Sequence, residues 1–447
     1  MTRLDPALSA AANRTDDSPI SDLMARALAS PDLVSLAAGF VDHATLPAEA
    51  VAQTVAAMMA DPVDGKRALQ YGTTRGDLAL RHQLVAFLER NEGVAAGTFA
   101  GALDRVVVTE GSQQLLYLVA EALLDPGDIV LVEAPTYFVF MGVLKSRGAT
   151  VLGVEIDRGG MRIDRLDATL ADLAARGLLD RVKLIYTVSE HSNPTGLSLA
   201  ADRRAALVRT AEKWSRSQRI FILEDAAYRG LAFDGPEPPS VWREDPAGET
   251  VILARTFSKT FSPGLKTGYG VLPESLVGPI LNLKSNHDFG SNHFTQQVLQ
   301  RAMSSGSYDR QIALLAETYR AKRDAILEAL DEHLGPFGVD VSWTRPKGGI
   351  YVWLTLPESI DTGREGAFFA RCLDEGVLYV PGIYAFPEGP TPAPRNTARL
   401  SYGVAPIPLL REGITRLAAA LHGHLRSLPA SRTADPRAVA GEATASR

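Results

Sequence analysis

The amino-acid sequence predicts an α/β fold, with a large domain built on a mainly parallel sheet and a smaller α+β domain after it. Three observations support this prediction. Short apolar runs alternate with amphipathic helical segments through the middle of the chain, as in parallel sheets that helices cover on both faces. After about residue 310 this alternation gives way to a long helical segment and several separate apolar runs. At 447 residues the chain is too long for one ordinary core, which indicates two or three domains.

The first part of the chain is expected to alternate helices with short strands. Residues 1 to about 30 are predicted to form an irregular arm that leads into a short helix, and residues 34–40 a strand that runs into a glycine turn. The helix after Gly76 has its apolar residues on one face, at Leu80, Leu84, Phe87 and Leu88. Residues 106–109 are a predicted buried strand. The helix that follows it has an apolar stripe at Leu115, Leu118, Val119 and Leu123 and ends at Pro126-Gly127-Asp128.

The remaining elements set the domain boundaries. Further strands are predicted at residues 129–132, 182–186, 220–223 and 251–253, then a helix at 314–333 and strands at 348–354, 377–380 and 398–402. We therefore expect an N-terminal arm and part of the small domain in residues 1–45, the large domain in 46–305 and the small domain in 306–427. Residues 428–447 are rich in Ala, Arg, Ser, Thr and Pro without periodicity, which predicts a disordered tail.

Composition excludes several classes of protein. The net charge of −6 gives no reason to expect nucleic acid or an anionic membrane as a partner. The one cysteine, Cys372, forms no intramolecular disulfide and no metal-ligand set, and is expected to be a small buried hydrophobe. Charged residues interrupt the N-terminal apolar stretches, and there is no uncharged run of about 18 residues, so neither a signal peptide nor a membrane span is predicted. The sequence therefore predicts a soluble, cytoplasmic protein.

Polar residues follow three successive predicted strands. Lys259 lies in Thr256-Phe257-Ser258-Lys259-Thr260, Asp225 in Glu224-Asp225-Ala226-Ala227-Tyr228, and Asn193 in Ser192-Asn193-Pro194-Thr195-Gly196. The separations, 225 − 193 = 32 and 259 − 225 = 34 residues, are each about one strand–helix unit. In open α/β sheets, ligands bind at the carboxyl ends of the strands. A lone lysine after a strand is usually solvated, but the three residues together indicate a functional site.

In this order the motifs resemble those of the class I and II aminotransferases, which are fold-type I enzymes dependent on pyridoxal 5′-phosphate. The resemblance covers the chain from about residue 33 to residue 425. It implies a large cofactor-binding domain and the transfer of an amino group between an L-amino acid and a 2-oxo acid by a ping-pong mechanism. It also implies that Lys259 holds the cofactor aldehyde as an imine and later acts as the base at the substrate α-carbon. Asp225 would keep the pyridine nitrogen protonated, so that the ring is an electron sink.

The resemblance assigns further residues to the cofactor. Asn193 and Tyr228 match the residues that bind its phenolic oxygen, with Tyr228 also counted as catalytic, and Tyr137 matches the ring that stacks on the pyridine. The phosphate-binding positions are matched by Gly111, Ser112, Gln113, Thr256 and Ser258, the first three at a helix N-terminus. Taken singly, these features have plainer readings. Asp225 could be a helix N-cap, and Tyr137 and Tyr228 could be core tyrosines. Residues 193–196 could form a plain turn, and residues 110–113 could begin a capped helix that binds no ligand.

The resemblance also implies a substrate site and a dimer. Arg399 matches the arginine that binds the substrate α-carboxylate, a task suited to its planar guanidinium, with the Gly39 backbone and Asn193 beside it. Tyr71 resembles the tyrosine that reaches the phosphate of the partner subunit, so a homodimer with shared active sites is expected. The plainer reading of Tyr71 is a loop residue.

Two positions depart from the family pattern. Lys266 stands where an arginine is usual, so the phosphate contact is expected to be looser or shared. Arg255 replaces a residue that is usually small. We expect Arg255 to face solvent, and the alternatives are a contact with the phosphate or with an acidic side chain of the substrate. The polar segment 286–293 is expected near the subunit interface.

Two other functions compete with transamination. Another fold-type I enzyme, such as a lyase, decarboxylase, racemase or oxidase, would share the cofactor residues. The third hypothesis is a ligand-sensing domain. Such domains occur in regulators that join a winged helix to an aminotransferase-like module. The roughly 30 residues before residue 33 are too few for a DNA-binding domain and the chain is acidic, so this reading is disfavoured. The sequence does not identify the amino donor or acceptor.

Overall fold

The computed structural model describes residues 7–15, 23, 30, 32–389 and 392–427. Its centre is an eight-stranded sheet in the order β2-β9-β8-β7-β6-β3-β4-β5. Five adjacent strands, β8, β7, β6, β3 and β4, run parallel to one another. The remaining pairs are antiparallel: β9 with both β2 and β8, and β5 with β4. The strands are β2 (Val106–Thr109), β3 (Ile129–Ala134), β4 (Thr150–Asp157), β5 (Gly160–Met161), β6 (Val182–Thr187), β7 (Phe221–Asp225), β8 (Val251–Thr256) and β9 (Gly268–Val271). The prediction of an α/β fold with a mainly parallel sheet is confirmed.

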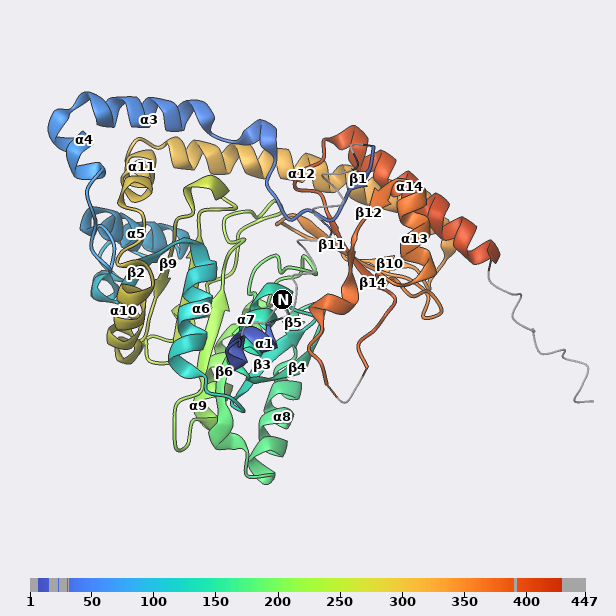
Figure 1. The fold of residues 1–447 in the computed structure, drawn as a ribbon, viewed down its shortest axis with the longest axis horizontal. Coiled ribbons are helices and arrows are strands. Elements are labelled where there is room, and N and C mark those ends of the chain that lie inside the picture. Colours follow the sequence, from blue (N-terminus) through green and yellow to red (C-terminus); the bar gives the residue numbers. More distant parts are fainter. Residues whose placement is uncertain (1–6, 16–22, 24–29, 31, 390–391, 428–447) are drawn as a thin grey trace, which may run out of the picture.

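Helices cover both faces of this sheet (Figure 1). Side chains alternate along β3, so Val130 and Val132 join one buried cluster while Ile129 and Leu131 join the other. The first cluster includes residues of α6 (Gly111–Leu123), α7 (Phe138–Arg147) and α10 (Glu274–Asp288). The second includes residues of α5 (Leu78–Asn91), α8 (Ile163–Ala175), α9 (Ala201–Trp214) and α11 (His293–Ser304). Strands buried on both faces explain why the sequence shows apolar runs rather than alternation.

The predicted helix after Gly76 is α5. The Asp77 side chain caps it by accepting a hydrogen bond of 2.8 Å from the Leu80 amide. Its predicted apolar face is buried, with Leu80, Leu84, Phe87 and Leu88 all in the core. In α6, Leu115, Leu118 and Val119 are buried as predicted, whereas Leu123 is only half-buried.

The last third of the chain forms a second, four-stranded antiparallel sheet in the order β10-β11-β14-β13. Its strands are β10 (Ser342–Trp343), β11 (Tyr351–Thr355), β13 (Val380–Pro381) and β14 (Thr397–Ser401). The helices of this part are α12 (Ser307–His333), α13 (Ala367–Asp374), which holds the buried Cys372 as expected, and α14 (Ile407–Ser427). In Figure 1, α12 runs below α3 from α11 to the C-terminal elements.

The N-terminal segments join both parts of the molecule. Helix α1 (Ala10–Arg14) lies against α7, where Arg14 donates hydrogen bonds of 3.0 and 3.2 Å to the Ser146 carbonyl. Strand β1 (Val34–Ser35) pairs in parallel with β12 (Val377–Leu378). Helices α3 (Ala48–Ala60) and α4 (Pro62–Ala68) then lead to α5. Most of the predicted arm between residues 16 and 31, and the tail predicted to be disordered, lie outside the described residues.

Several elements differ from the predictions. The predicted strand at 34–40 is only the two residues of β1, and the one at 377–380 is divided into β12 and β13. Strand β9 was not predicted, because its two glycines have low strand propensity. The fold needs them: a Cβ at Gly268 would lie 2.6 Å from the Gly111 carbonyl carbon, and one at Gly270 2.5 Å from Leu115 Cδ2. No helix in the described part of the chain is long and apolar enough to cross a membrane.

Candidate active site

The predicted site residues gather where the parallel strands end. Asp225 is the last residue of β7, Lys259 follows β8 by three residues, and Asn193 lies in the loop after β6. Tyr137 follows β3, and β3 and β6 are the neighbours at which the order of the strands reverses. Such a switch point is the usual ligand site of an open α/β sheet. Arg399, on β14 of the four-stranded sheet, closes the site from the opposite side, where it reaches Asn193.

The Lys259 amine lies near the centre of this group. Its Nζ donates a hydrogen bond of 2.8 Å to the Gly39 carbonyl. Burial lowers the pKa of Lys259, and the positive charges of Arg399 and Lys266 lower it further, while Tyr351 acts in the opposite direction. The amine is therefore more readily neutral, and so more nucleophilic, than an exposed lysine. Gly39 lies beside Arg399 as expected, since a Cβ added there would be 3.9 Å from Arg399 Nη2, and its carbonyl also binds Lys259.

Asp225 is a buried carboxylate without a cationic partner. Its side chain accepts hydrogen bonds of 2.9 Å from the Tyr186 hydroxyl and 3.2 Å from the Ala227 amide. It is 3% exposed and forms no ion pair with the described residues. Burial raises the pKa of Asp225 to about 6, against the effect of its two donors. No helix begins here, so the N-cap reading of Asp225 is wrong: the carboxylate caps a turn at residues 227–230.

Arg399 is a buried cation without an anionic partner. Its Nη1 donates 2.9 Å to Asn193 Oδ1 and its Nη2 donates 2.6 Å to the Ala37 carbonyl. The guanidinium lies 4.5 Å from the centroid of the Tyr351 ring. The residue is 2% exposed, its Nε has no hydrogen-bond partner, and no carboxylate of the described residues pairs with it.

Two tyrosines in the site were not predicted. Tyr351 receives a hydrogen bond of 3.2 Å from the Tyr228 hydroxyl and lies 3.5 Å from Asn193 Nδ2. Tyr186, the donor to Asp225, looked like the last apolar residue of a strand. The pair Gly348-Gly349 just before β11 was the only sequence signal for Tyr351. The predicted Tyr228 and Asn193 thus do meet, but through a residue from the other sheet.

A second group lies at the start of α6. Tyr137 Oη donates a weak hydrogen bond of 3.5 Å to Gln113 Oε1, and burial, with the nearby Asp225, raises the pKa of Tyr137. Glu110 provides no side-chain cap, so the reading of a capped helix without a ligand is not supported. The first residue, Gly111, has φ +70°, and a Cβ added there would meet only Thr256 Oγ1, at 3.8 Å.

These features fit a phosphate group. Thr256 Oγ1 donates 3.0 Å to Ser258 Oγ, which brings two hydroxyls of the lysine loop together beside this helix N-terminus. Ser112 and Gln113 are half-buried next to them. Free amides at the start of a 13-residue helix, together with hydroxyl donors, form a favourable anion site.

The remaining predicted residues lie apart from this centre. Lys266 is exposed, with φ +50°, at the end of a short turn, yet its charge acts on Lys259. Tyr71 is 79% exposed, and its ring meets Phe289 edge-on at 5.7 Å between centroids. A single chain does not bring Tyr71 to the other site residues.

The expectation that Arg255 faces solvent is wrong. The residue is 3% exposed, its Nη2 donates 3.4 Å to the Arg229 carbonyl, and its guanidinium lies 5.6 Å from the Phe87 ring centroid. Strand β8 is central in the sheet, so side chains on both of its faces are buried. Because side chains alternate, Arg255 points away from the face that Thr256 presents to the site.

Comparisons with known proteins agree with this geometry. The family model for aminotransferase class I and II matches residues 31–414. The chain is 32% identical to aromatic-amino-acid aminotransferase 1 of Thermococcus litoralis, over 88% of this chain and 89% of that protein. It is 31% identical to 2-aminoadipate transaminase of Thermus thermophilus, over 93% and 96% of the two chains. The crystal structure of Pyrococcus horikoshii kynurenine aminotransferase in complex with PMP matches with a TM-score of 0.84 at 31% identity, over 94% of this chain and 97% of that one.

Proposed function

The chain belongs to the aminotransferase class I and II family, and from this premise we propose how its own residues transfer an amino group between an L-amino acid and a 2-oxo acid. The enzyme is a transaminase dependent on pyridoxal 5′-phosphate. When bound, this cofactor supplies an aldehyde carbon that accepts the amino group and a ring that withdraws electrons. The roles below are those of the protein side chains.

One observation carries the proposal: the site holds two buried side chains of opposite charge, and neither has a counter-charge. Asp225 has no cation and Arg399 no anion among the described residues, and Arg399 is close enough to the Lys259 amine to lower the pKa of the lysine. An unpaired buried charge is costly, so each position favours a ligand that brings the counter-charge. A protonated pyridine nitrogen provides it for Asp225, and an α-carboxylate provides it for Arg399.

The remaining contacts hold and orient these ligands. The amides at the start of α6, with Ser112, Thr256, Ser258 and the charge of Lys266, would hold the phosphate. The hydroxyl of Tyr228 and the amide of Asn193 would donate to the phenolic oxygen. Lys259, with its lowered pKa, would take the proton from the α-carbon of the amino donor in one half-reaction, and as its conjugate acid would deliver a proton to the α-carbon derived from the 2-oxo acid in the other.

We propose that the active enzyme is a homodimer. Large apolar side chains are exposed around α3, α4 and the end of α10, which supports a covered surface. They are Met59, Val63, Leu69, Tyr71, Leu78 and Phe289. A partner on this surface would use Tyr71 to complete the phosphate site, and the segment 286–293 would lie at the interface.

Domain division and cellular location are also proposals. The boundary 305/306 is supported by the short connection between α11 and α12, and the boundary 45/46 by the start of α3 at Ala48, since α3 packs against α11. A cytoplasmic location is supported by the single, free Cys372.

Relatives named for aromatic amino acids, 2-aminoadipate and kynurenine support an amino donor with a long side chain.

The test is Arg399→Lys, assayed with a panel of amino donors against 2-oxoglutarate and pyruvate. Loss of a desolvated charge-assisted pair costs about 2 to 5 kcal/mol, so kcat/KM should fall by roughly 30-fold to several thousand-fold for every donor. Cofactor absorbance and affinity should stay unchanged. Arg255→Lys is the matched control, because Arg255 is an equally buried strand arginine on the other face of the sheet.

Three results would contradict the proposal. A loss confined to acidic donors would make Arg399 a side-chain specificity residue. Loss of the cofactor would give Arg399 a phosphate role. Product formation that needs no 2-oxo acid would indicate a lyase, decarboxylase or racemase instead of a transaminase.

A further inference from the structure

A cavity of about 830 Å³ lies behind the Asn193 loop, outside the site described above. Four segments contribute to its lining: residues 190–201 after β6, residues 232–238, the β10–β11 hairpin of the four-stranded sheet, and the turn between β4 and β5, which provides Arg158. Lys259, Asp225 and Arg399 do not line it. Its volume is that of pockets that hold small organic molecules.

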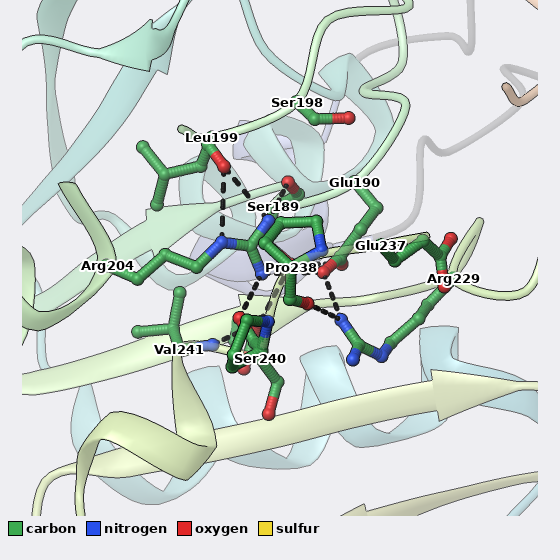
Figure 2. A network of polar contacts seen from close by, with 12 residues as sticks. Ser189, Glu190, Ser198, Leu199, Arg204, Arg229, Glu237, Pro238, Ser240 and Val241 are labelled. Atoms are coloured by element: carbon green, nitrogen blue, oxygen red, sulfur yellow. Dashed lines mark hydrogen bonds and ion pairs between the residues drawn. The ribbon is translucent and has the colours of Figure 1, made fainter. Parts of the chain in front are cut away.

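The floor of the cavity includes Glu190, which belongs to a buried network of charges (Figure 2). Glu190 lies between Arg204 and Arg229, with 2.7 Å from its Oε1 to a nitrogen of each. Arg204 also donates to the Leu199 and Pro239 carbonyls, at 3.0 and 2.8 Å. Because both guanidinium groups are almost fully buried and already paired, this floor is rigid and its carboxylate is not available to a ligand.

The other acidic side chains of the wall are also engaged. Glu237 accepts hydrogen bonds of 2.9 and 3.0 Å from the Gly230 amide and lies 3.3 Å from His191 Nε2. Asp234 is paired with Arg323. The wall therefore offers a ligand no free negative charge among the described residues.

Unlike the acidic side chains, two of the three basic side chains of the wall have no ion-pair partner among the described residues. Arg345 is paired with Asp331. Arg158 and Lys347 are exposed on the wall and form no ion pair within the part of the chain that the structure describes. Two uncompensated cations beside a concave surface favour an anionic ligand.

The apolar part of the wall is aromatic. Trp343 and Trp353 both line the cavity. In the pairing of β10 with β11, Trp343 lies opposite Leu354, the neighbour of Trp353. Side chains alternate along a strand, so the Trp343 indole points to the other face of the sheet, where it packs against the core, and Trp353 presents the aromatic ring to the cavity.

We propose that this cavity binds a small carboxylate with an aromatic body, the carboxylate facing Arg158 and Lys347 and the ring packing against Trp353. The site goes beyond the transaminase function and does not use its residues. It is nevertheless close to the amino-acid site, since Trp353 is the strand partner of Arg399 in the β11–β14 ladder.

The test is calorimetric titration of the full-length holoenzyme with 2-naphthoate, and with 2-naphthalenemethanol as the uncharged control of the same shape. Wild-type protein should bind 2-naphthoate at least about tenfold more tightly than the alcohol, and the double variant Arg158→Ala/Lys347→Ala should lose about tenfold or more of that affinity. The matched control is Arg345→Ala, because Arg345 lies on the same wall but is already paired. Its affinity should stay within about twofold of wild type.

Three outcomes would overturn the proposal. They are absence of 2-naphthoate binding to wild type at millimolar concentration, equal affinity of the double variant and wild type, or an equal loss of affinity in Arg399→Lys. The last would place the probe in the amino-acid site. Both exposed residues lie outside the transamination machinery, so the double variant should keep wild-type turnover and thermal stability. Binding is measured without turnover, so its failure is distinguishable from failure of the proposed function.

Discussion

Replacement of Asp225 by asparagine should stabilise the protein without cofactor while weakening cofactor binding. In the cofactor-free chain the carboxylate is buried and has no cationic partner. Asparagine has nearly the same shape and carries no charge. Its Oδ1 can accept from the Ala227 amide as Asp225 does, and its Nδ2 can donate to the Tyr186 oxygen, so each group keeps one hydrogen-bond partner although the direction of the tyrosine contact is reversed.

The size of the effect follows from the pKa of Asp225. Burial raises that pKa from 3.8 to about 6 in the folded protein. Between pH 3.8 and about pH 6 the Asp225 carboxyl is ionised in the unfolded chain but still protonated in the folded protein. The free energy of unfolding therefore falls as the pH rises through this range, and the full penalty is present above about pH 6. A difference of about 2 pKa units corresponds to about 3 kcal/mol at pH 8 and to about half of that at pH 5.

The assay is chemical denaturation of the cofactor-free variant and wild type at pH 5 and pH 8, with cofactor affinity measured by absorbance. Loss of the charge at the ring nitrogen should weaken cofactor binding by about 10-fold to 150-fold. Glu133→Gln is the matched control. Glu133 is also buried, with its pKa raised to about 7 by burial, and bonds to Thr187 and Val188 outside the site.

The control variant Glu133→Gln should also have a higher free energy of unfolding than wild type at pH 8, and it should keep the wild-type affinity for the cofactor. The reasoning is refuted if Asp225→Asn is no more stable than wild type at pH 8 without cofactor, or if its advantage grows toward acid. Near-normal turnover of this variant with cofactor bound would separately contradict the role of Asp225 at the ring nitrogen.

Three further predictions test individual contacts. Borohydride treatment of the holoenzyme should abolish the near-visible absorbance and fix the label on Lys259, and a label on Lys266 would contradict the assignment. If the dimer shares its sites, mixing inactive Lys259→Ala with an inactive Tyr71 variant should restore part of the activity, and no recovery despite subunit exchange would refute it. Arg204→Ala should lower the free energy of unfolding by about 3 to 5 kcal/mol because it breaks a buried charge network. Arg203→Ala, at the more exposed neighbour, should cost less than about 1 kcal/mol in the same denaturation assay.

The sequence predicts those parts of the fold that local pattern determines. Strand β2 has the predicted bounds, and α5 buries the predicted face, because apolar spacing and the Asp77 cap are local signals. The meeting of Asp225, Lys259 and Asn193 was also predictable, since neighbouring parallel strands end at one edge of the sheet.

Features that depend on partners distant in the sequence were not predictable. Tyr351 reaches Tyr228 and Asn193 only because the four-stranded sheet packs over the strand ends, 123 and 158 residues away along the chain. The burial of Arg255 was not predicted, because the residue pattern of a strand does not reveal that both faces of β8 are covered. Strand β9 was missed because glycines that allow close packing look like a loop in the sequence.

An unpaired buried charge does not by itself identify a site in this protein. Arg255 is as buried as Arg399 and forms no ion pair with the described residues, yet it lies over the Phe87 ring on the opposite face of the sheet from the lysine loop. What distinguishes the active site is that an anion, a cation and a neutralisable amine converge there, on elements from both sheets. The cofactor would supply the missing cation beside Asp225 and the substrate the missing anion beside Arg399, and a ligand that binds only the folded chain adds to its stability. The holoenzyme should therefore be more stable than the cofactor-free protein, and this gain should be smaller in Asp225→Asn and unchanged in Glu133→Gln.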